Sequence, residues 1–257
     1  MKEINPLSIS SFYTETFFNE IKLGTATSFA YKYKDKKFLI TNYHVAFGLN
    51  PENNILLNNK GAIPNKIIIN YYTKDFILMY YTILFGDQQN PFKFIKIYST
   101  IVDIAVFQLD DKFNGVCINE IENLFNFPKF ETDIILHITE QLYVLGYPRS
   151  INIYNTPIWK RSSIASEPEL DPNEIPYFYI DTTTREGMSG APVIFYTENG
   201  NYKRSNGCQV LAGGNAYNLA GIYSGRDHND ESHIAQLGKV WKKELIEKII
   251  EEKFINI

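Results

Sequence analysis

Short hydrophobic runs separated by polar turns recur along most of the chain. Residues 26–33 and 38–41 alternate apolar and polar positions on either side of the polar turn KDKK at 34–37, which predicts a β-hairpin. Other runs rich in β-branched and aromatic residues predict strands at 66–72, 76–85, 92–98, 104–109, 141–145, 158–165, 177–181, 191–196, 209–213 and 219–223. Short strands at regular spacing favour an all-β barrel or sandwich without choosing between the two.

Four segments depart from this strand pattern. Residues 11–22 predict a short amphipathic helix, and 240–254 predict a longer one because apolar residues recur there at helical spacing. Residues 111–132 are mixed in composition and predict a linker. Residues 150–176 contain four prolines and form the kind of long connection that is usually functional or disordered in a compact domain. The predicted organisation is an N-terminal extension (1–22), a first β-barrel (23–112), a linker (113–132), a second β-barrel (133–235) and a C-terminal helix (236–257).

Composition and charge exclude several classes of protein. With 257 residues, 44% hydrophobic content and 21% charged residues, the chain has the balance of an ordinary globular protein with a proper core. Its net charge is −4 and its Lys and Arg residues are scattered, so no basic patch for nucleic acid or membrane is expected. The first ten residues lack an apolar run of signal-peptide length, and no run approaches a membrane span.

The two cysteines, Cys117 and Cys208, are far apart and form no metal-spaced pair. A secreted protein of this size would often carry several disulfides, so the sequence indicates a reducing, cytoplasmic setting. A bridge between Cys117 and Cys208 stays open as the alternative.

Candidate chemistry centres on Ser189, which lies between two glycines in REGMSGAPV at 185–193. A nucleophilic serine needs a tight turn that exposes its hydroxyl, together with backbone N–H groups that bind the developing oxyanion. Gly187 and Ser189 are the candidate donors of those N–H groups. Taken alone, the motif also fits an ordinary turn serine.

Two further residues lie upstream of Ser189 in contexts that suit a general base and its partner. His44 ends an apolar strand in FLITNYHV at 38–45, and Asp103 opens the apolar run DIAVF at 103–107. A lone histidine at a strand end or an aspartate at a strand start is often only structural. The chain order His44, Asp103, Ser189, however, is that of the chymotrypsin-type catalytic triad. His44 and Asp103 belong to the first set of strands and Ser189 to the second, so a cleft between two barrels would bring them together.

Six motifs in this order resemble the trypsin-like serine peptidases of the chymotrypsin fold, specifically their bacterial intracellular or Htr-type branch without a PDZ domain. The motifs are GTATSF (24–29), TNYHV (41–45), DIAV (103–106), LGYP (145–148), GMSGAPV (187–193) and AGIYSG (220–225). The resemblance covers residues 23–250. It implies two six-stranded antiparallel β-barrels with a C-terminal helix, and a serine endopeptidase that works through an acyl-enzyme without a metal or organic cofactor.

The resemblance also has departures that bear on activation and specificity. Met188 stands where digestive trypsins have an aspartate that pairs with a newly cut N-terminus, so activation by that route is not expected. Thr183 matches the base of the trypsin specificity pocket, which removes the reason to expect cleavage after Lys or Arg. The predicted substrate-binding residues are Thr183, Thr184, Glu186, Ser224, Gly225 and Arg226. Arg226 would favour an acidic side chain, or is a solvated loop residue, and Asp181 is a strand-end residue.

The expected partners are a polypeptide substrate and an activating or regulatory protein, with no nucleic acid and no membrane. Two alternatives remain: a catalytically silent binding module on the same fold, and an esterase-type acyl hydrolase with the same triad. Residues 150–176 are predicted to rim the site and to gate it.

Overall fold

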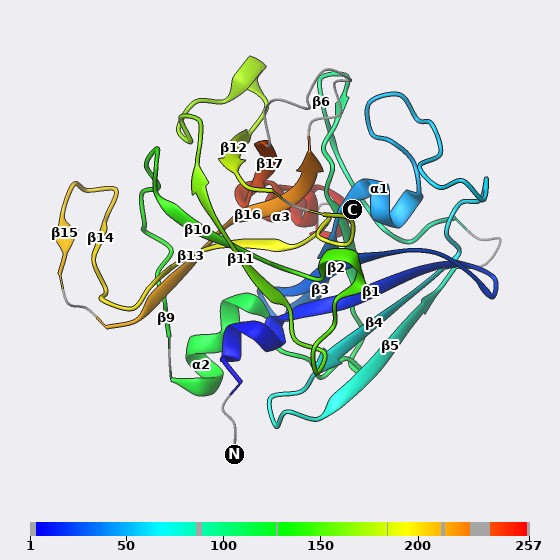
Figure 1. Ribbon diagram of the computed structural model, residues 1–257, viewed down its shortest axis with the longest axis horizontal. Coiled ribbons are helices and arrows are strands. Elements are labelled where there is room, and N and C mark those ends of the chain that lie inside the picture. Colours follow the sequence, from blue (N-terminus) through cyan, green and yellow to red (C-terminus); the bar gives the residue numbers. More distant parts are fainter. Residues whose placement is uncertain are drawn as a thin grey trace.

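The computed structural model describes residues 4–85, 89–126, 128–183, 185–211, 214–226 and 237–255. Two β units lie side by side, and a C-terminal helix packs against both (Figure 1). The predicted all-β class with two six-stranded units and a C-terminal helix is confirmed. No helix in the described ranges is long and apolar enough to cross a membrane.

The first unit is a curled, half-barrel sheet in which every pair of neighbours is antiparallel. Its strand order is β5-β4-β1-β2-β3-β8. The strands are β1 (Ser11–Phe18), β2 (Ile21–Tyr33), β3 (Lys36–Thr41), β4 (Lys66–Tyr72), β5 (Leu78–Leu84) and β8 (Ala105–Gln108). β2 and β3 form the hairpin that the alternation at 26–41 predicts.

The amphipathic helix predicted at 11–22 is wrong, because β1 occupies this segment and pairs with both β2 and β4. Its polar side chains find partners across the sheets instead of facing water. The Thr14 and Ser28 hydroxyls lie 2.7 Å apart, and the Ser11 hydroxyl donates to the Leu145 carbonyl at 2.8 Å. These long-range bonds stabilise a strand here, although the apolar residues have the spacing of a helix.

The second unit is a closed six-stranded barrel with the order β13-β10-β11-β12-β17-β16, closed by pairing of β16 with β13. Its strands are β10 (Gln141–Gly146), β11 (Ile158–Ile164), β12 (Tyr177–Asp181), β13 (Pro192–Thr197), β16 (Ala216–Arg226) and β17 (Leu237–Lys242). A short strand, β9 (Lys129–Phe130), adds to β16 in parallel. Two small hairpins complete the β structure: β6 (Lys96–Ile97) with β7 (Thr100–Ile101), and β14 (Tyr202–Lys203) with β15 (Gln209–Val210).

The helices are short. The α-helices are α1 (Tyr43–Phe47), α2 (Ile121–Phe125) and α3 (Glu244–Ile250), and α3 continues as the π-helical turn η5 (Glu251–Ile255). The 3₁₀ turns are η1 (Pro6–Ser10), η2 (Ile118–Glu120), η3 (Pro148–Ser150) and η4 (Pro172–Glu174). The predicted C-terminal helix therefore starts later than expected, because Val240 and Trp241 belong to β17 and pair with β12 and β16.

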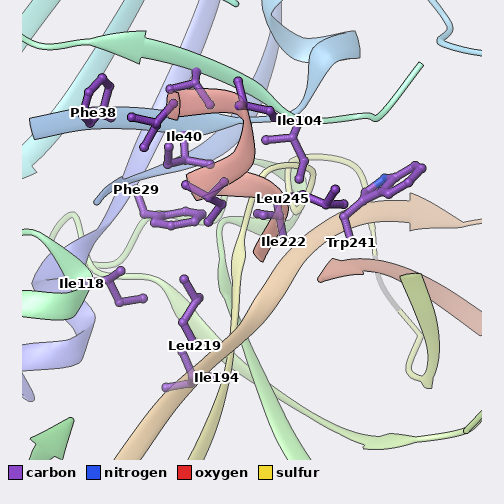
Figure 2. Close-up of a cluster of buried hydrophobic side chains, with 14 of the residues drawn as sticks. Phe29, Phe38, Ile40, Ile104, Ile118, Ile194, Leu219, Ile222, Trp241 and Leu245 are labelled. Atoms are coloured by element: carbon purple, nitrogen blue, oxygen red, sulfur yellow. The ribbon is translucent and has the colours of Figure 1, made fainter. Parts of the chain in front are cut away.

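One hydrophobic cluster joins α3 to both β units (Figure 2). Leu245 and Ile246 of α3 are buried in it, together with Phe29 from the first unit and Leu219 and Ile222 from the second. Because its apolar face fills the junction, α3 holds the two units, and hence the cleft between them, in one arrangement.

Replacing Ile246 by Ala is expected to lower the free energy of unfolding by about 2–5 kcal/mol, because the loss of a fully buried side chain leaves a cavity. Urea denaturation measures this loss. The matched control is Lys248→Ala on the exposed side of α3, which is expected to change stability by less than about 0.5 kcal/mol. Equal effects of the two substitutions would contradict this role for α3.

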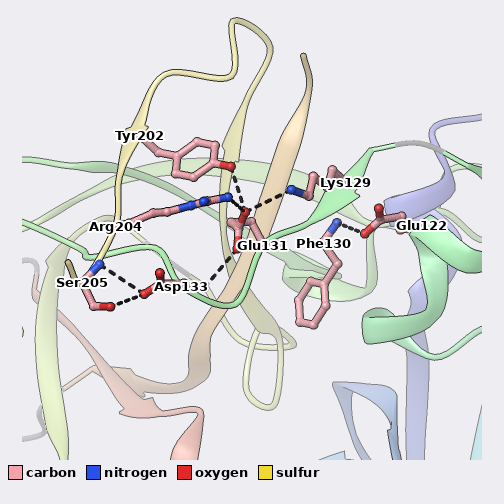
Figure 3. A network of polar contacts seen from close by, with 8 residues as sticks. All are labelled: Glu122, Lys129, Phe130, Glu131, Asp133, Tyr202, Arg204 and Ser205. Carbon is pink, nitrogen blue, oxygen red and sulfur yellow. Dashed lines mark hydrogen bonds and ion pairs between the residues drawn. The ribbon is translucent and has the colours of Figure 1, made fainter. Parts of the chain in front are cut away.

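A polar network ties β9 to the β14–β15 hairpin (Figure 3). The Glu131 carboxylate, 8% exposed, accepts hydrogen bonds from the Arg204 guanidinium at 2.7 Å and from the Tyr202 hydroxyl at 2.9 Å, and Lys129 lies 3.2 Å away. Burial by itself raises the pKa of Glu131, but these hydrogen bonds outweigh it and lower the pKa from 4.5 to about 2.

Glu131→Gln is therefore expected to lower stability in a pH-dependent way. Because the pKa of Glu131 is lower in the folded state, its ionised carboxylate contributes its full stabilisation above about pH 5. This contribution disappears as the pH falls from about 4.5 towards 2. The expected loss at pH 7 is roughly 3 kcal/mol. Urea unfolding between pH 7 and pH 2 should show the two proteins converging as the pH falls. The exposed Glu169→Gln is the control, and a difference for Glu131→Gln that does not vary with pH would contradict the prediction.

Candidate active site

His44 and Asp103 form a hydrogen-bonded pair next to the junction of the two units. His44 lies in the first turn of α1, which follows β3 directly, and Gly48 ends this helix with a left-handed φ of 69°. Asp103 precedes β8 and is 2% exposed. Its Oδ2 lies 2.8 Å from His44 Nδ1, and its Oδ1 accepts the His44 backbone N–H at 2.9 Å. One carboxylate thus holds both the ring and the backbone of His44.

The surroundings of Asp103 keep it ionised. Burial disfavours the carboxylate, but the opposite charge and hydrogen bond of His44 and a hydrogen bond from the Ser224 hydroxyl hold its pKa below the ordinary value. The side chain of Asn42 donates to the Asp103 carbonyl at 2.7 Å and fixes the backbone as well. With Asp103 accepting at Nδ1–H, Nε2 is the ring nitrogen left to take a proton.

The loop that carries Ser189 needs its two glycines for steric reasons. Gly187 and Gly190 have φ values of +94° and +83°. A Cβ on Gly187 would lie 2.2 Å from the Tyr147 carbonyl oxygen, and one on Gly190 would lie 2.1 Å from the Thr27 carbonyl oxygen. Backbone therefore passes so close on both sides of Ser189 that only glycine fits.

Thr27 of β2 connects this loop to the first unit. Its N–H donates to the Ser189 carbonyl at 2.8 Å, and its hydroxyl donates to the Gly187 carbonyl at 2.8 Å. Its own carbonyl accepts the Thr41 hydroxyl at 2.9 Å, three residues before His44. Thr27 thus sets the position of the Ser189 loop relative to the strand that leads to His44, a role that nothing in the sequence pattern indicates.

His44, Asp103, Ser189, Ser224 and Gly225 all line one cavity of about 450 Å³. A Cβ on Gly225 would lie 4.0 Å from Ser189 Oγ, so β16 passes beside this hydroxyl. The remaining walls include apolar and aromatic side chains, among them Leu57, Ile101, Ile175, Tyr177 and Trp241. The structure therefore brings together the three residues whose chain order the sequence singles out.

The other predicted substrate-binding residues are not among the described residues that line this cavity. Thr183 is half-buried and lines a second cavity, and Thr184 lies outside the described residues. The side chain of Glu186 is exposed, whereas its carbonyl accepts the Arg149 N–H at 2.6 Å. Arg226 ends β16, with its backbone paired to Gly238, and its side chain lies outside the described part.

The Ser224 hydroxyl donates to Asp103, while the predicted binding of substrate by the backbone of Ser224 stays a prediction. The motif AGIYSG predicts a strand but does not reveal that the Ser224 hydroxyl has a partner 121 residues away.

Part of the segment 150–176 borders the cleft. Ile175 lines it, and Lys242 of β17 holds this stretch through an ion pair with Asp171 at 2.6 Å. The Tyr98 hydroxyl, in the β6–β7 hairpin, donates to Glu174. The predicted position at the rim thus agrees with the structure for residues near 175, while gating stays a prediction.

No protein-family model matches the chain, and no match is found among curated protein sequences. Solved structures do resemble it. A serine endoprotease from Yersinia pestis is 14% identical with a TM-score of 0.50, and the match covers 95% of this chain and 62% of that one. The Rv3671c protease from M. tuberculosis, in its inactive form, is 15% identical with a TM-score of 0.48, and the match covers 96% of this chain and 89% of that one. At such identities the likeness to the Yersinia structure shows the fold, a trypsin-like double barrel.

Proposed function

We propose that the protein is a serine endopeptidase with Ser189 as nucleophile, His44 as general base and Asp103 as the residue that orients His44. The observation that carries the proposal is the buried Asp103 carboxylate bonded to His44 Nδ1, with both residues lining the cavity that contains Ser189. This arrangement leaves Nε2 to take the Ser189 proton as Oγ attacks the scissile carbonyl. His44 then protonates the leaving amine, and water hydrolyses the acyl-enzyme by the same steps.

The backbone N–H groups of Gly187 and Ser189 are the proposed oxyanion donors. Two observations support this role. The carbonyls of both residues are held by Thr27, which orients the loop, and within the described ranges neither N–H donates to another group. Preorganised donors of this kind stabilise the tetrahedral intermediate because they need no reorientation during the reaction.

A polypeptide substrate would add to β16 as a further strand. β13 pairs with β16 only as far as Pro192 opposite Ile222, while β17 pairs with the other edge up to Arg226. Residues 224–226 therefore present one strand edge beside Ser189, and strand addition uses such an edge. This edge supports a peptide rather than a small ester as the substrate, because a small ester has no backbone to add as a strand.

The proposal extends to a bacterial, cytoplasmic protease with restricted or regulated activity and an activating protein partner. The support for a reducing compartment is that Cys117 and Cys208 are both free thiols. A role for Arg226 in selecting acidic side chains and a closing motion of residues near 175 belong to the same proposal.

Labelling with a fluorophosphonate, followed by mass spectrometry of the modified peptide, tests the nucleophile. The expected result is one adduct on Ser189, and cleavage-site profiling on a proteome should then find peptide bonds cut by the same protein. Absence of any adduct would favour a silent binding module. An adduct with turnover of small esters but of no polypeptide would favour the esterase.

A further inference from the structure

A second cavity, of about 340 Å³, lies next to the Ser189 loop. Met188 and Thr183 line it together with Pro148, Arg149, Ile151, Lys160 and Arg185. Ser189 and His44 are not among its lining residues, so this cavity is distinct from the cleft of the proposed active site.

Three cationic side chains and no carboxylate line this cavity: Arg149, Lys160 and Arg185. Across the described part of the chain, none of the three side chains forms an ion pair or a hydrogen bond. Lys160 lies on the face of β11 that also carries the buried residues Ser162 and Ile164, so its stem points to the barrel interior near the barrel end. Arg149 and Arg185 are exposed and Lys160 is half-buried, and three cations around one cavity without a carboxylate favour an anionic ligand.

One of the lining residues, Arg149, bonds to the peptide that would supply an oxyanion donor. The Arg149 N–H donates to the Glu186 carbonyl at 2.6 Å, and this carbonyl shares its peptide unit with the Gly187 N–H. In a trans peptide these two groups point in opposite directions, so the bond from Arg149 sets the direction of the Gly187 N–H. Arg149 and Ser150 are both left-handed, with φ values of 50° and 59°, which is uncommon for side chains of this kind.

We infer that this cavity binds a compact oxyanion, a phosphate or carboxylate group, and that the bound anion orders the loop that carries Gly187. One anion that contacts both Arg149 and Arg185 would link the residue that holds the Glu186 carbonyl to the residue that precedes Glu186. Binding would therefore favour the loop conformation seen here. Anion binding and the ordering of the loop do not depend on catalysis by Ser189. A rise in activity on anion binding, by contrast, rests on the proposed function.

The test compares the wild type with Lys160→Gln combined with Arg185→Gln, and with Arg161→Gln as the matched control. Arg161 is the next residue of β11, exposed and directed away from the cavity. Calorimetric titration at constant ionic strength with inorganic phosphate and with citrate separates phosphate from carboxylate. The expected result is saturable binding of at least one probe, weakened about tenfold or more in the double variant and unchanged in the control. Bound anion should also slow hydrogen exchange of peptides that cover residues 185–190.

No saturable binding, equal binding by the double variant and the control, or binding without slower exchange would each overturn the inference. Fluorophosphonate labelling of Ser189 should become about fivefold faster or more at saturating anion. Labelling without anion reports on the proposed function alone. If Ser189 never labels while binding and slower exchange are observed, the proposed function fails and the anion site stands.

Discussion

Ser189→Ala is expected to lower kcat on a cleavable peptide by about 10⁶-fold, because the substitution removes the proposed nucleophile that forms the acyl-enzyme. KM should stay within about twofold of the wild-type value, and the free energy of unfolding within about 0.5 kcal/mol. The Ser189 hydroxyl makes no hydrogen bond to the rest of the described chain, and its removal leaves the backbone bond to Thr27 intact. Steady-state kinetics and thermal unfolding of the purified protein measure the two effects.

The matched control is Ser99→Ala. Ser99 is an exposed serine that lines the same cavity, on the β6–β7 hairpin, and its removal is expected to leave kcat within about threefold of the wild type. If Ser189→Ala keeps more than a hundredth of the wild-type kcat, another nucleophile acts and the proposed mechanism fails.

Asp103→Asn is expected to lower kcat by about 10⁴-fold without unfolding the protein. Asn has the shape of Asp, but its amide N–H₂ donates where the carboxylate accepted. His44 would then accept at Nδ1 and carry its proton on Nε2, the nitrogen that has to act as base. The imidazolium that forms during the reaction would also lose its counter-charge.

Ser224→Ala separates this role from a general weakening of the site. It removes one hydrogen bond to Asp103 and leaves both bonds to His44 and the Asn42 bond in place. A single hydrogen bond to a charged group corresponds to a loss of at most about 100-fold. An Asp103→Asn protein within tenfold of the wild type, or a Ser224→Ala protein less active than Asp103→Asn, would contradict the assignment of Asp103.

Local signals in the sequence predicted most strands correctly. The β2–β3 hairpin, β4, β10, β11 and β12 follow alternation or β-branched runs, which depend only on neighbouring residues. Two errors lie where pairing partners are distant, whereas the strands predicted at 92–98 and 209–213 are shorter in the structure. At β1 and β17, apolar residues at helical spacing belong to strands because each is held between two other strands.

The candidate site divides in the same way. By itself, the sequence determined the chain order His44, Asp103, Ser189. It also determined the glycines near the serine, because a tight turn requires these residue types locally. Only the tertiary structure decided that Thr27 holds the Gly187 carbonyl across 160 residues, that Ser224 bonds to Asp103, and that Arg149 bonds to the peptide of Gly187. Such contacts arise when two β units close around one cleft, and their register depends on packing between distant strands, which no local pattern encodes.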